Sequence, residues 1–235
     1  QDIYENLKDI LKLTQGLILI SGPTGSGKTT TLYSILKELN SDDKKIITVE
    51  DPIEYKIDSI NQVPINNKVG LSFELVLKNI LRQDPDIIFI GEIRDKFSLD
   101  IALQASLTGH LVLASIHASS SVETITRLID LKADPFLIST TLKAVMAQRL
   151  VLAHCKSCEN GCKKCNFTKF YDRTSISEIL KVDEQISSLI FNKASFNELK
   201  EYLKNINFKT ILDNGKQKVK DGLTTLEEVY KVVNY

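Results

Sequence analysis

The sequence predicts an α/β protein with a mostly parallel central sheet, and three patterns predict it. A glycine-rich loop at residues 22–30, GPTGSGKTT, fits the phosphate-binding pattern G-x-x-x-x-G-K-[ST]. Apolar runs at 45–49, 86–90 and 111–116 are typical of strands buried on both faces of a parallel sheet. Stretches with apolar residues at helical spacing separate these runs, and this alternation is characteristic of strand–helix–strand folds.

Composition and charge limit the classes of function. The 235 residues include 30 Lys or Arg and 30 Asp or Glu, so no overall field favours nucleic acid, and we expect none as a partner. No apolar run reaches the roughly 18 residues that a membrane-spanning helix needs, so we expect no transmembrane segment. The chain opens on Gln1 without a signal-peptide pattern, and we expect it to be part of a longer protein.

The first third of the chain predicts alternating helices and strands. Apolar residues share one helical face over 2–13, and the run 17–20 before the glycine loop predicts a buried strand. An amphipathic helix is expected over 31–39, after the loop, and leads to the strand at 45–49. Residues 55–70 contain proline, asparagine and glycine, which suggests a hairpin.

The glycine loop predicts a site for the phosphates of a nucleotide. Its glycines let the backbone approach an anion, and the following helix adds the positive end of its dipole. Lys28 is expected to reach the β- and γ-phosphates, and the Thr29 hydroxyl to bind Mg2+. A glycine-rich turn that binds nothing is the alternative, against which the flanking strand and helix argue. The predicted nucleotide-binding residues here are Gly22, Thr24, Gly25, Ser26, Gly27, Lys28, Thr29 and Thr30.

Three carboxylates follow the strand at 45–49, and we call Glu50, Asp51 and Glu54 the acidic group. Ligands of open parallel sheets bind outside the carboxyl ends of the strands, so the acidic group should face the glycine loop. A solvated turn around Pro52 is the alternative.

A helix that begins near Ser72 leads to the strand at 86–90, which ends on Gly91 and Glu92. A carboxylate at this position can orient or deprotonate an attacking water, and we assign this catalytic role to Glu92. Gly91 replaces the aspartate that usually helps to hold Mg2+ in phosphate-loop enzymes. We therefore expect the acidic group to supply the missing charge, with Glu50 as a catalytic residue and Glu54 as a nucleotide-binding residue.

Two histidines flank the strand at 111–116. His117 follows its carboxyl end, where an imidazole beside the γ-phosphate could contact it, whereas His110 precedes the strand. A purely structural role is the alternative for each histidine, and more so for His110.

Helices are predicted through most of the remaining chain. Asp134 and the proline after it fit an N-cap and first turn, which predicts a helix over 136–150. Beyond Asn166 the chain is predicted to be helical, with capping-box starts at Ser175 and Thr224.

The four cysteines form two Cys-x2-Cys units separated by three residues. Four thiolates in a tetrahedral arrangement suit a structural Zn2+, and this grouping points to a reducing compartment, so we expect a cytosolic protein. An iron–sulfur cluster or free thiols are the alternatives. The predicted metal ligands are Cys155, Cys158, Cys162 and Cys165.

Several motifs together resemble those of the secretion ATPase superfamily, most closely the assembly ATPases of type II secretion systems and type IV pili. The glycine loop at 22–30 resembles the family's phosphate loop, TVEDPIE at 48–54 its aspartate box, and IGEIRD at 90–95 its modified Walker B segment. Residues 108–117 resemble its histidine box, and AQRL at 147–150 the segment before its tetracysteine motif. The resemblance covers nearly the whole chain, although the gap between the two cysteine pairs is shorter than in the family.

The resemblance implies a RecA-like P-loop ATPase core at 1–152, a small tetracysteine metal lobe at 153–168 and a C-terminal helical subdomain at 169–235. It also implies a homo-hexameric ring, with Glu92 as the catalytic carboxylate and His117 near the γ-phosphate. The family also has an N-terminal domain that supplies arginines to the nucleotide, and we expect this chain to lack it. We therefore expect the chain to bind ATP and hydrolyse it poorly, and to be monomeric without that domain.

The implied function is an ATP hydrolase that powers assembly of a type IV pilus or a type II secretion pseudopilus, in protein secretion or DNA uptake. Its partner would be an inner-membrane platform protein, which would place it in the cytoplasm, peripheral to that membrane. A pilus retraction ATPase is one alternative, and the cysteines favour assembly over it. A RecA-type nucleic-acid motor and a nucleotide-dependent scaffold are others; the zero net charge argues against the motor.

Overall fold

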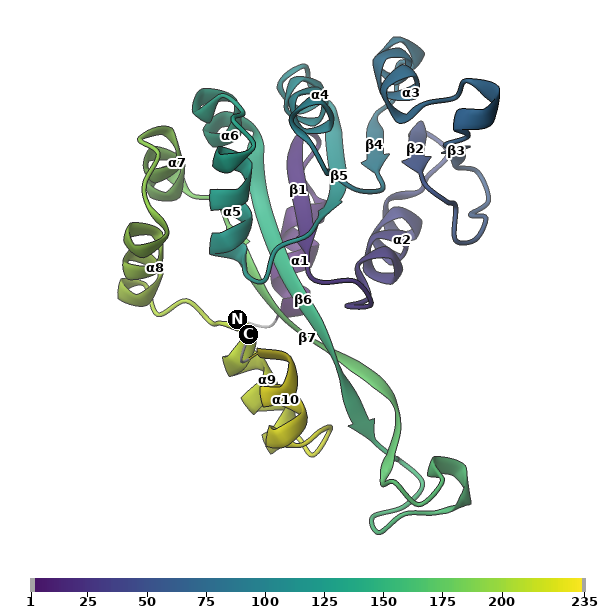
Figure 1. Cartoon of the computed structure of the whole chain (residues 1–235), viewed down its shortest axis with the longest axis vertical. Helices are drawn as coiled ribbons and strands as arrows, with labels where there is room; N and C mark the ends of the chain where they lie inside the picture. Colours follow the sequence, from purple (N-terminus) through teal and green to yellow (C-terminus); the bar gives the residue numbers. More distant parts are fainter. Residues whose placement is uncertain (1–2, 234–235) are drawn as a thin grey trace.

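A computed structural model describes residues 3–233 and shows one seven-stranded sheet with helices on both faces (Figure 1). The strand order is β3-β2-β4-β5-β1-β6-β7, and every neighbouring pair is parallel except β6 and β7. The mostly parallel α/β fold is thus confirmed. The strands are β1 Gly16–Ser21, β2 Ile46–Glu50, β3 Asn61–Pro64, β4 Ile87–Ile90, β5 Leu111–Ile116, β6 Leu142–His154 and β7 Phe170–Lys181.

The helices form two layers, because residues of α1 and α2 pack into one buried cluster and those of α3 to α8 into another. Within the described residues no helix is both long and apolar enough to cross a membrane. The α-helices are α1 Ile3–Leu11, α2 Lys28–Leu39, α3 Phe73–Ile80, α4 Lys96–Leu107, α5 Ser121–Asp130, α6 Pro135–Thr141, α7 Glu184–Phe191, α8 Phe196–Asn205, α9 Ile211–Lys220 and α10 Leu226–Val233.

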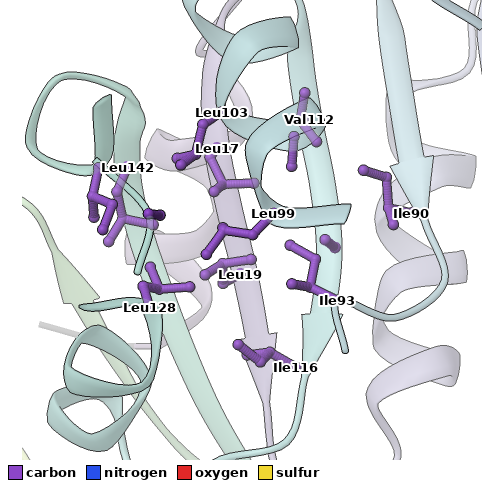
Figure 2. Packing of buried hydrophobic residues seen from close by; sticks show 14 of the residues in the cluster. Leu17, Leu19, Ile90, Ile93, Leu99, Leu103, Val112, Ile116, Leu128 and Leu142 are labelled. Carbon is purple, nitrogen blue, oxygen red and sulfur yellow. The ribbon is translucent and has the colours of Figure 1, made fainter. Parts of the chain in front are cut away.

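Strand β1 shows why the central strands are apolar throughout. Leu17 and Leu19 point into the cluster under α4 and α5 (Figure 2). Ile18 and Ile20 belong to the cluster under α2. Successive side chains of a strand face opposite sides of the sheet, so both sets are removed from water only where helices cover both faces. All six residues of the strand are buried, and it delivers the glycine loop at its carboxyl end.

The prediction of a helix over 136–150 is correct up to Thr141 and wrong from Leu142 onward. The predicted cap is correct, since Asp134 accepts a hydrogen bond from the Phe136 amide and Pro135 begins α6. The helix ends at Thr141, and the chain continues as the long strand β6. Its residues pair with β1 on one side and β7 on the other, and this tertiary pairing outweighs the helical preference of Ala, Leu, Met and Gln.

The capping box predicted at Ser175 is also wrong, because Ser175 and Glu178 lie inside β7 and face β6. The second predicted box is shifted: α10 begins at Leu226, and the Thr224 hydroxyl instead donates to the Leu152 carbonyl at 2.7 Å. Residues 55–70 do not form the predicted hairpin of two strands, since β3 pairs parallel to β2. The antiparallel pairing in this region is a single bridge between Asn66 and Leu71.

Beyond the sheet, β6 and β7 continue as a two-stranded ribbon that ends in the loop at 155–169 (Figure 1). This loop contains the four cysteines. Helices α9 and α10 pack beside this ribbon around a small cluster that includes Val151, Ile176, Ile211 and Val229. The His154 amide donates to the Leu223 carbonyl at 2.9 Å, which attaches the segment before α10 to the ribbon.

Candidate functional site

A cavity of about 930 Å3 lies at the carboxyl ends of β2, β4 and β5, beside the glycine loop. It is large enough for a nucleotide, because ligand pockets commonly measure about 300–1,000 Å3. The sequence-predicted residues that line it are Thr24, Gly25, Ser26, Gly27, Lys28, Thr29, Thr30, Glu50, Glu54, Glu92 and His117. Gly22 is not among the lining residues and lies at the start of the loop, where its carbonyl contacts Lys28.

The glycine loop has a backbone that only glycine adopts without strain. Gly27 precedes α2 with φ of 85°, and no side chain caps the helix, which leaves its first amides to a ligand. A Cβ atom on Gly27 would lie 2.8 Å from Nε2 of Gln148, and one on Gly22 would lie 2.6 Å from the Gln148 carbonyl oxygen. The loop therefore fits the phosphates of a nucleotide.

The Lys28 ammonium lies within this loop. It donates to the carbonyls of Gly22 at 2.8 Å and Pro23 at 3.1 Å. Burial lowers the pKa of Lys28, the charge of Glu92 raises it, and Arg149 lowers it further. The ammonium is thus partly desolvated, so an anion bound beside it in the glycine loop would gain a poorly hydrated cation as its partner.

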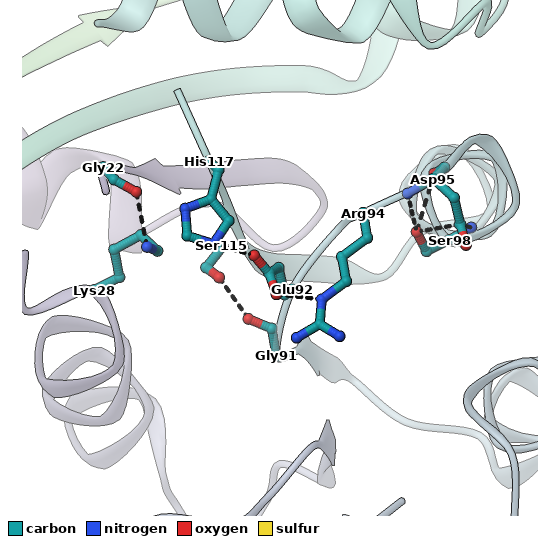
Figure 3. Close-up of polar contacts among 9 residues, drawn as sticks. All are labelled: Gly22, Lys28, Gly91, Glu92, Arg94, Asp95, Ser98, Ser115 and His117. Atoms are coloured by element: carbon teal, nitrogen blue, oxygen red, sulfur yellow. Dashed lines mark hydrogen bonds and ion pairs between the residues drawn. The ribbon is translucent and has the colours of Figure 1, made fainter. Parts of the chain in front are cut away.

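Glu92 lies where β4 ends, between two cationic or potentially cationic groups (Figure 3). One carboxylate oxygen contacts Nε2 of His117, and the other accepts from Nε of Arg94. The hydrogen bond that Arg94 donates to Glu92 is the main cause that raises the pKa of Arg94. The Ser115 hydroxyl donates to the Gly91 carbonyl at 2.6 Å, which fixes the backbone just before Glu92. The side chain of Glu92 is only 17% exposed, so these contacts orient it toward the cavity.

Gly91 is explained by the close packing of β4 against β2. Its amide donates to the Val49 carbonyl at 2.8 Å, and a Cβ atom would lie 3.1 Å from the same oxygen. An aspartate side chain therefore meets a tight backbone here. The oxygen-rich donors that line the cavity instead are the Thr29 hydroxyl and carboxylates such as Asp51 and Glu54, and such donors suit Mg2+.

The acidic group is divided by burial. Asp51 and Glu54 are exposed, whereas Glu50 is 2% exposed and accepts hydrogen bonds from three side chains. Its Oε2 accepts from the Tyr33 hydroxyl, and its Oε1 accepts from the Thr48 hydroxyl at 2.5 Å and from Gln62 at 3.2 Å. The structure thus brings Glu50 to the predicted site with its oxygens already paired.

Two residues beside the glycine loop were not predicted as site residues. Gln148 on β6 donates to the Ser26 carbonyl and accepts from the Thr31 hydroxyl, both at 2.8 Å. Arg149 donates to the Ser119 carbonyl at 2.8 Å, just beyond His117. The AQRL segment pointed to both residues, but the incorrect helix over 136–150 did not place them beside the glycine loop.

The four cysteine Sγ atoms lie within 4.8 Å of one another at the ribbon tip. Cys155 and Cys165 are buried, and the Cys162 amide donates to Sγ of Cys165 at 3.2 Å. That hydrogen bond is the main cause that lowers the pKa of Cys165 to about 6, whereas burial is the main cause that raises the pKa of Cys158 to about 12. The arrangement fits a closed four-thiolate metal site, and zinc is compatible with it.

We expect the purified chain to contain about one zinc per chain by elemental analysis. Cys158→Ser should lower this stoichiometry, because it removes one of the four thiolates, whereas Ser157→Ala in the same loop should not. Iron, or no metal in the unsubstituted chain, would contradict the zinc assignment.

Comparisons with known proteins agree with this geometry. The sequence profile of the family described as Type II/IV secretion system protein matches residues 1–231. The chain is 42% identical over 255 residues to the type II secretion system ATPase E of Vibrio cholerae, covering 97% of this chain and 50% of that protein. It is 40% identical over 255 residues to the type IV pilus assembly ATPase PilB of Thermus thermophilus, covering 97% of this chain and 29% of that protein.

A solved structure of the pilus retraction motor PilT with bound ADP has a TM-score of 0.80 and 30% identity, covering 97% of this chain and 64% of that one. The ATPase DotB of Legionella pneumophila has a TM-score of 0.79 and 26% identity, covering 98% and 63%. The chain spans about half the length of curated relatives such as the Vibrio protein. With a matching profile over 231 of its residues, this chain belongs to the Type II/IV secretion system protein family.

Proposed function

We propose that this chain is the motor domain of an ATPase that powers assembly of a type IV pilus or a type II secretion pseudopilus. The observation that carries the proposal is the meeting of Lys28 and Glu92 in one cavity at the glycine loop. The names of the relatives support the choice of process, since they include secretion and pilus assembly ATPases.

The proposed reaction is attack of water on the γ-phosphate of ATP. The glycine-loop amides and Lys28 would hold the phosphates, and Glu92 would orient the water and accept its proton. His117, in contact with Glu92, would lie beside the γ-phosphate. Positioning and neutralisation of charge supply most of the catalysis in such reactions.

Thr29 and the acidic group are the residues that would hold Mg2+. When bound, this ion neutralises charge on the β- and γ-phosphates. Glu50, whose oxygens are already paired, would contribute its negative charge from its buried position, and the exposed Glu54 would reach toward the nucleotide.

The full protein would work as a homo-hexamer on an inner-membrane platform protein, from the cytoplasmic side. In this proposal the core spans 1–152, the metal lobe 153–168 and the C-terminal subdomain 169–235, whose strand β7 completes the sheet of the core and whose helices α7 and α8 pack on it. A retraction motor is the second candidate, favoured by the likeness to PilT, and the four cysteines favour assembly.

The direct test is ATP binding by calorimetry, followed by release of phosphate. Lys28→Ala is expected to weaken ATP binding by about 10- to 150-fold, since a charge-assisted hydrogen bond contributes about 1.5–3 kcal/mol. Lys12→Ala is the matched control, because Lys12 is exposed, pairs with Asp9 and lies outside the residues that line the cavity. Unchanged binding by the Lys28 variant, or no binding by the unsubstituted chain, would contradict the proposal.

A further inference from the structure

Tyr33 is a buried polar side chain that the proposed reaction does not yet use. It lies on α2, the helix that begins at Lys28, and it is 0% exposed. Its ring meets those of Tyr55 and Phe89 edge-on, with centroid distances of 4.6 Å and 6.2 Å. A phenylalanine would satisfy these ring contacts, so packing alone does not explain the hydroxyl.

The hydroxyl of Tyr33 forms two hydrogen bonds to the acidic group. It donates to Oε2 of Glu50 and accepts from the backbone amide of Glu54 at 3.2 Å. Burial is the main cause that raises the pKa of Tyr33, and the bond to Glu50 adds to it, so the hydroxyl keeps its proton and remains a donor. A single group that donates and accepts therefore joins the end of β2 to the loop after it.

Gln62 on β3 holds the same loop from the other side. Its side-chain amide donates to Oε1 of Glu50 and to the Tyr55 carbonyl, both at 3.2 Å, and its oxygen accepts from the Ile57 amide at 2.8 Å. The loop that carries Asp51 and Glu54 is thus attached to β3 through Gln62 and to α2 through Tyr33. Of these two attachments, the one through Tyr33 leads to the helix that carries Lys28 and Thr29.

We propose that Tyr33 is a positioning residue that fixes the acidic group relative to Lys28 and Thr29, so that the site binds nucleotide together with Mg2+. This inference rests on the proposed function. Without the hydroxyl, Glu50 would lose a donor in a buried position and the Glu54 amide would lose its acceptor, which allows the acidic loop to move away from the helix. The phosphate contacts of the glycine loop would remain, because they do not involve Tyr33.

The test compares ATP affinity with Mg2+ and with EDTA, measured by calorimetry on the whole chain. In Tyr33→Phe we expect affinity in EDTA within twofold of the unsubstituted chain, and the gain on adding Mg2+ to fall by about tenfold. Tyr202→Phe is the matched control. Tyr202 lies on α8, outside the residues that line the cavity, and its hydroxyl also donates to a carboxylate, that of Asp183, at 2.9 Å. Its Mg2+-dependent gain should not change.

A double variant distinguishes positioning from a general loss of structure. Glu54→Ala should itself reduce the Mg2+-dependent gain, and adding Tyr33→Phe should reduce it little further if both act through one loop. Gln62→Leu removes the hydrogen bonds that attach the same loop to β3, so it should also reduce the gain in ATP affinity on adding Mg2+ and leave the affinity in EDTA unchanged. This variant tests the inference if Tyr33→Phe does not fold.

Three results would overturn the inference: an unchanged Mg2+-dependent gain in Tyr33→Phe, an equal loss with and without Mg2+, or fully additive losses in the double variant. These differ from failure of the proposed function. In that case the unsubstituted chain would bind no ATP, and both proposals would fall together.

Discussion

In the full-length protein, Glu92→Gln is expected to lower ATP turnover by about a hundredfold or more while ATP affinity changes little. Glutamine has nearly the same shape but cannot accept a proton from water, and a positioned general base contributes about 10^2- to 10^4-fold to a rate. The contacts to Arg94 and His117 place the Glu92 carboxylate at the end of β4 rather than within the glycine loop. Phosphate release and calorimetry on the same preparation separate the two effects.

The matched control is Glu74→Gln, an exposed carboxylate on α3 that pairs with Lys78. Its turnover should equal that of the unsubstituted full-length protein. Turnover reduced less than about tenfold in Glu92→Gln would remove Glu92 from the catalytic role. In cells, filament assembly that survives this substitution in the full-length protein would show that hydrolysis is not the function.

Glu178→Leu is expected to lower the free energy of unfolding by about 3–5 kcal/mol. The substitution removes a buried carboxylate that accepts several hydrogen bonds, and the buried groups that donate them would be left unpaired. Glu178 is 4% exposed on β7. One oxygen accepts from the amide and hydroxyl of Ser121 at 2.8 Å and 2.7 Å, and the other accepts from the Ile211 amide at 2.9 Å. Those two residues are the first of α5 and α9, so one side chain caps two helices.

Urea unfolding followed by circular dichroism measures this loss. Glu178→Gln should cost less than the leucine variant, since the amide oxygen still accepts from one of the two helices. Glu227→Ala should leave the midpoint unchanged, because Glu227 is exposed and contacts only Lys231 among the ion pairs. If Glu178→Leu lowers the free energy of unfolding by less than about 1 kcal/mol, water accepts the hydrogen bonds in place of the carboxylate, and the prediction is wrong.

Local patterns predicted the elements whose causes are local. Ser72 caps α3 by accepting from the Leu75 amide, and Asp134 with Pro135 begins α6, as their positions in the sequence indicated. The strand at 111–116 has the predicted bounds because its continuous apolar run has no helical period. The strand β6 was not predictable this way, since its residues prefer a helix and only pairing with β1 and β7 makes them a strand.

In the candidate site, too, the sequence predicts what depends on local patterns and misses what depends on contacts between distant elements. The rule that ligands bind at the carboxyl ends of parallel strands correctly brought Glu50, Glu92 and His117 to one cavity. No pattern indicated that Glu50 is buried, because its burial depends on Tyr33 and Gln62, which come from other elements. Gln148 reaches the glycine loop for the same reason, through a strand 122 residues away from Ser26.

The ribbon of β6 and β7 also constrains how the length of the chain can vary during evolution. One residue inserted between Leu142 and Leu152 would turn every later side chain to the opposite face and break the register with β7. The loop at 155–169 has no such register, and lengthening a loop costs little, about 0.6 kcal/mol per doubling. The alignment with the Vibrio protein covers 255 positions against 235 residues here, so lengths in the family do differ. The cysteine loop can absorb such insertions while Gln148 stays beside the glycine loop.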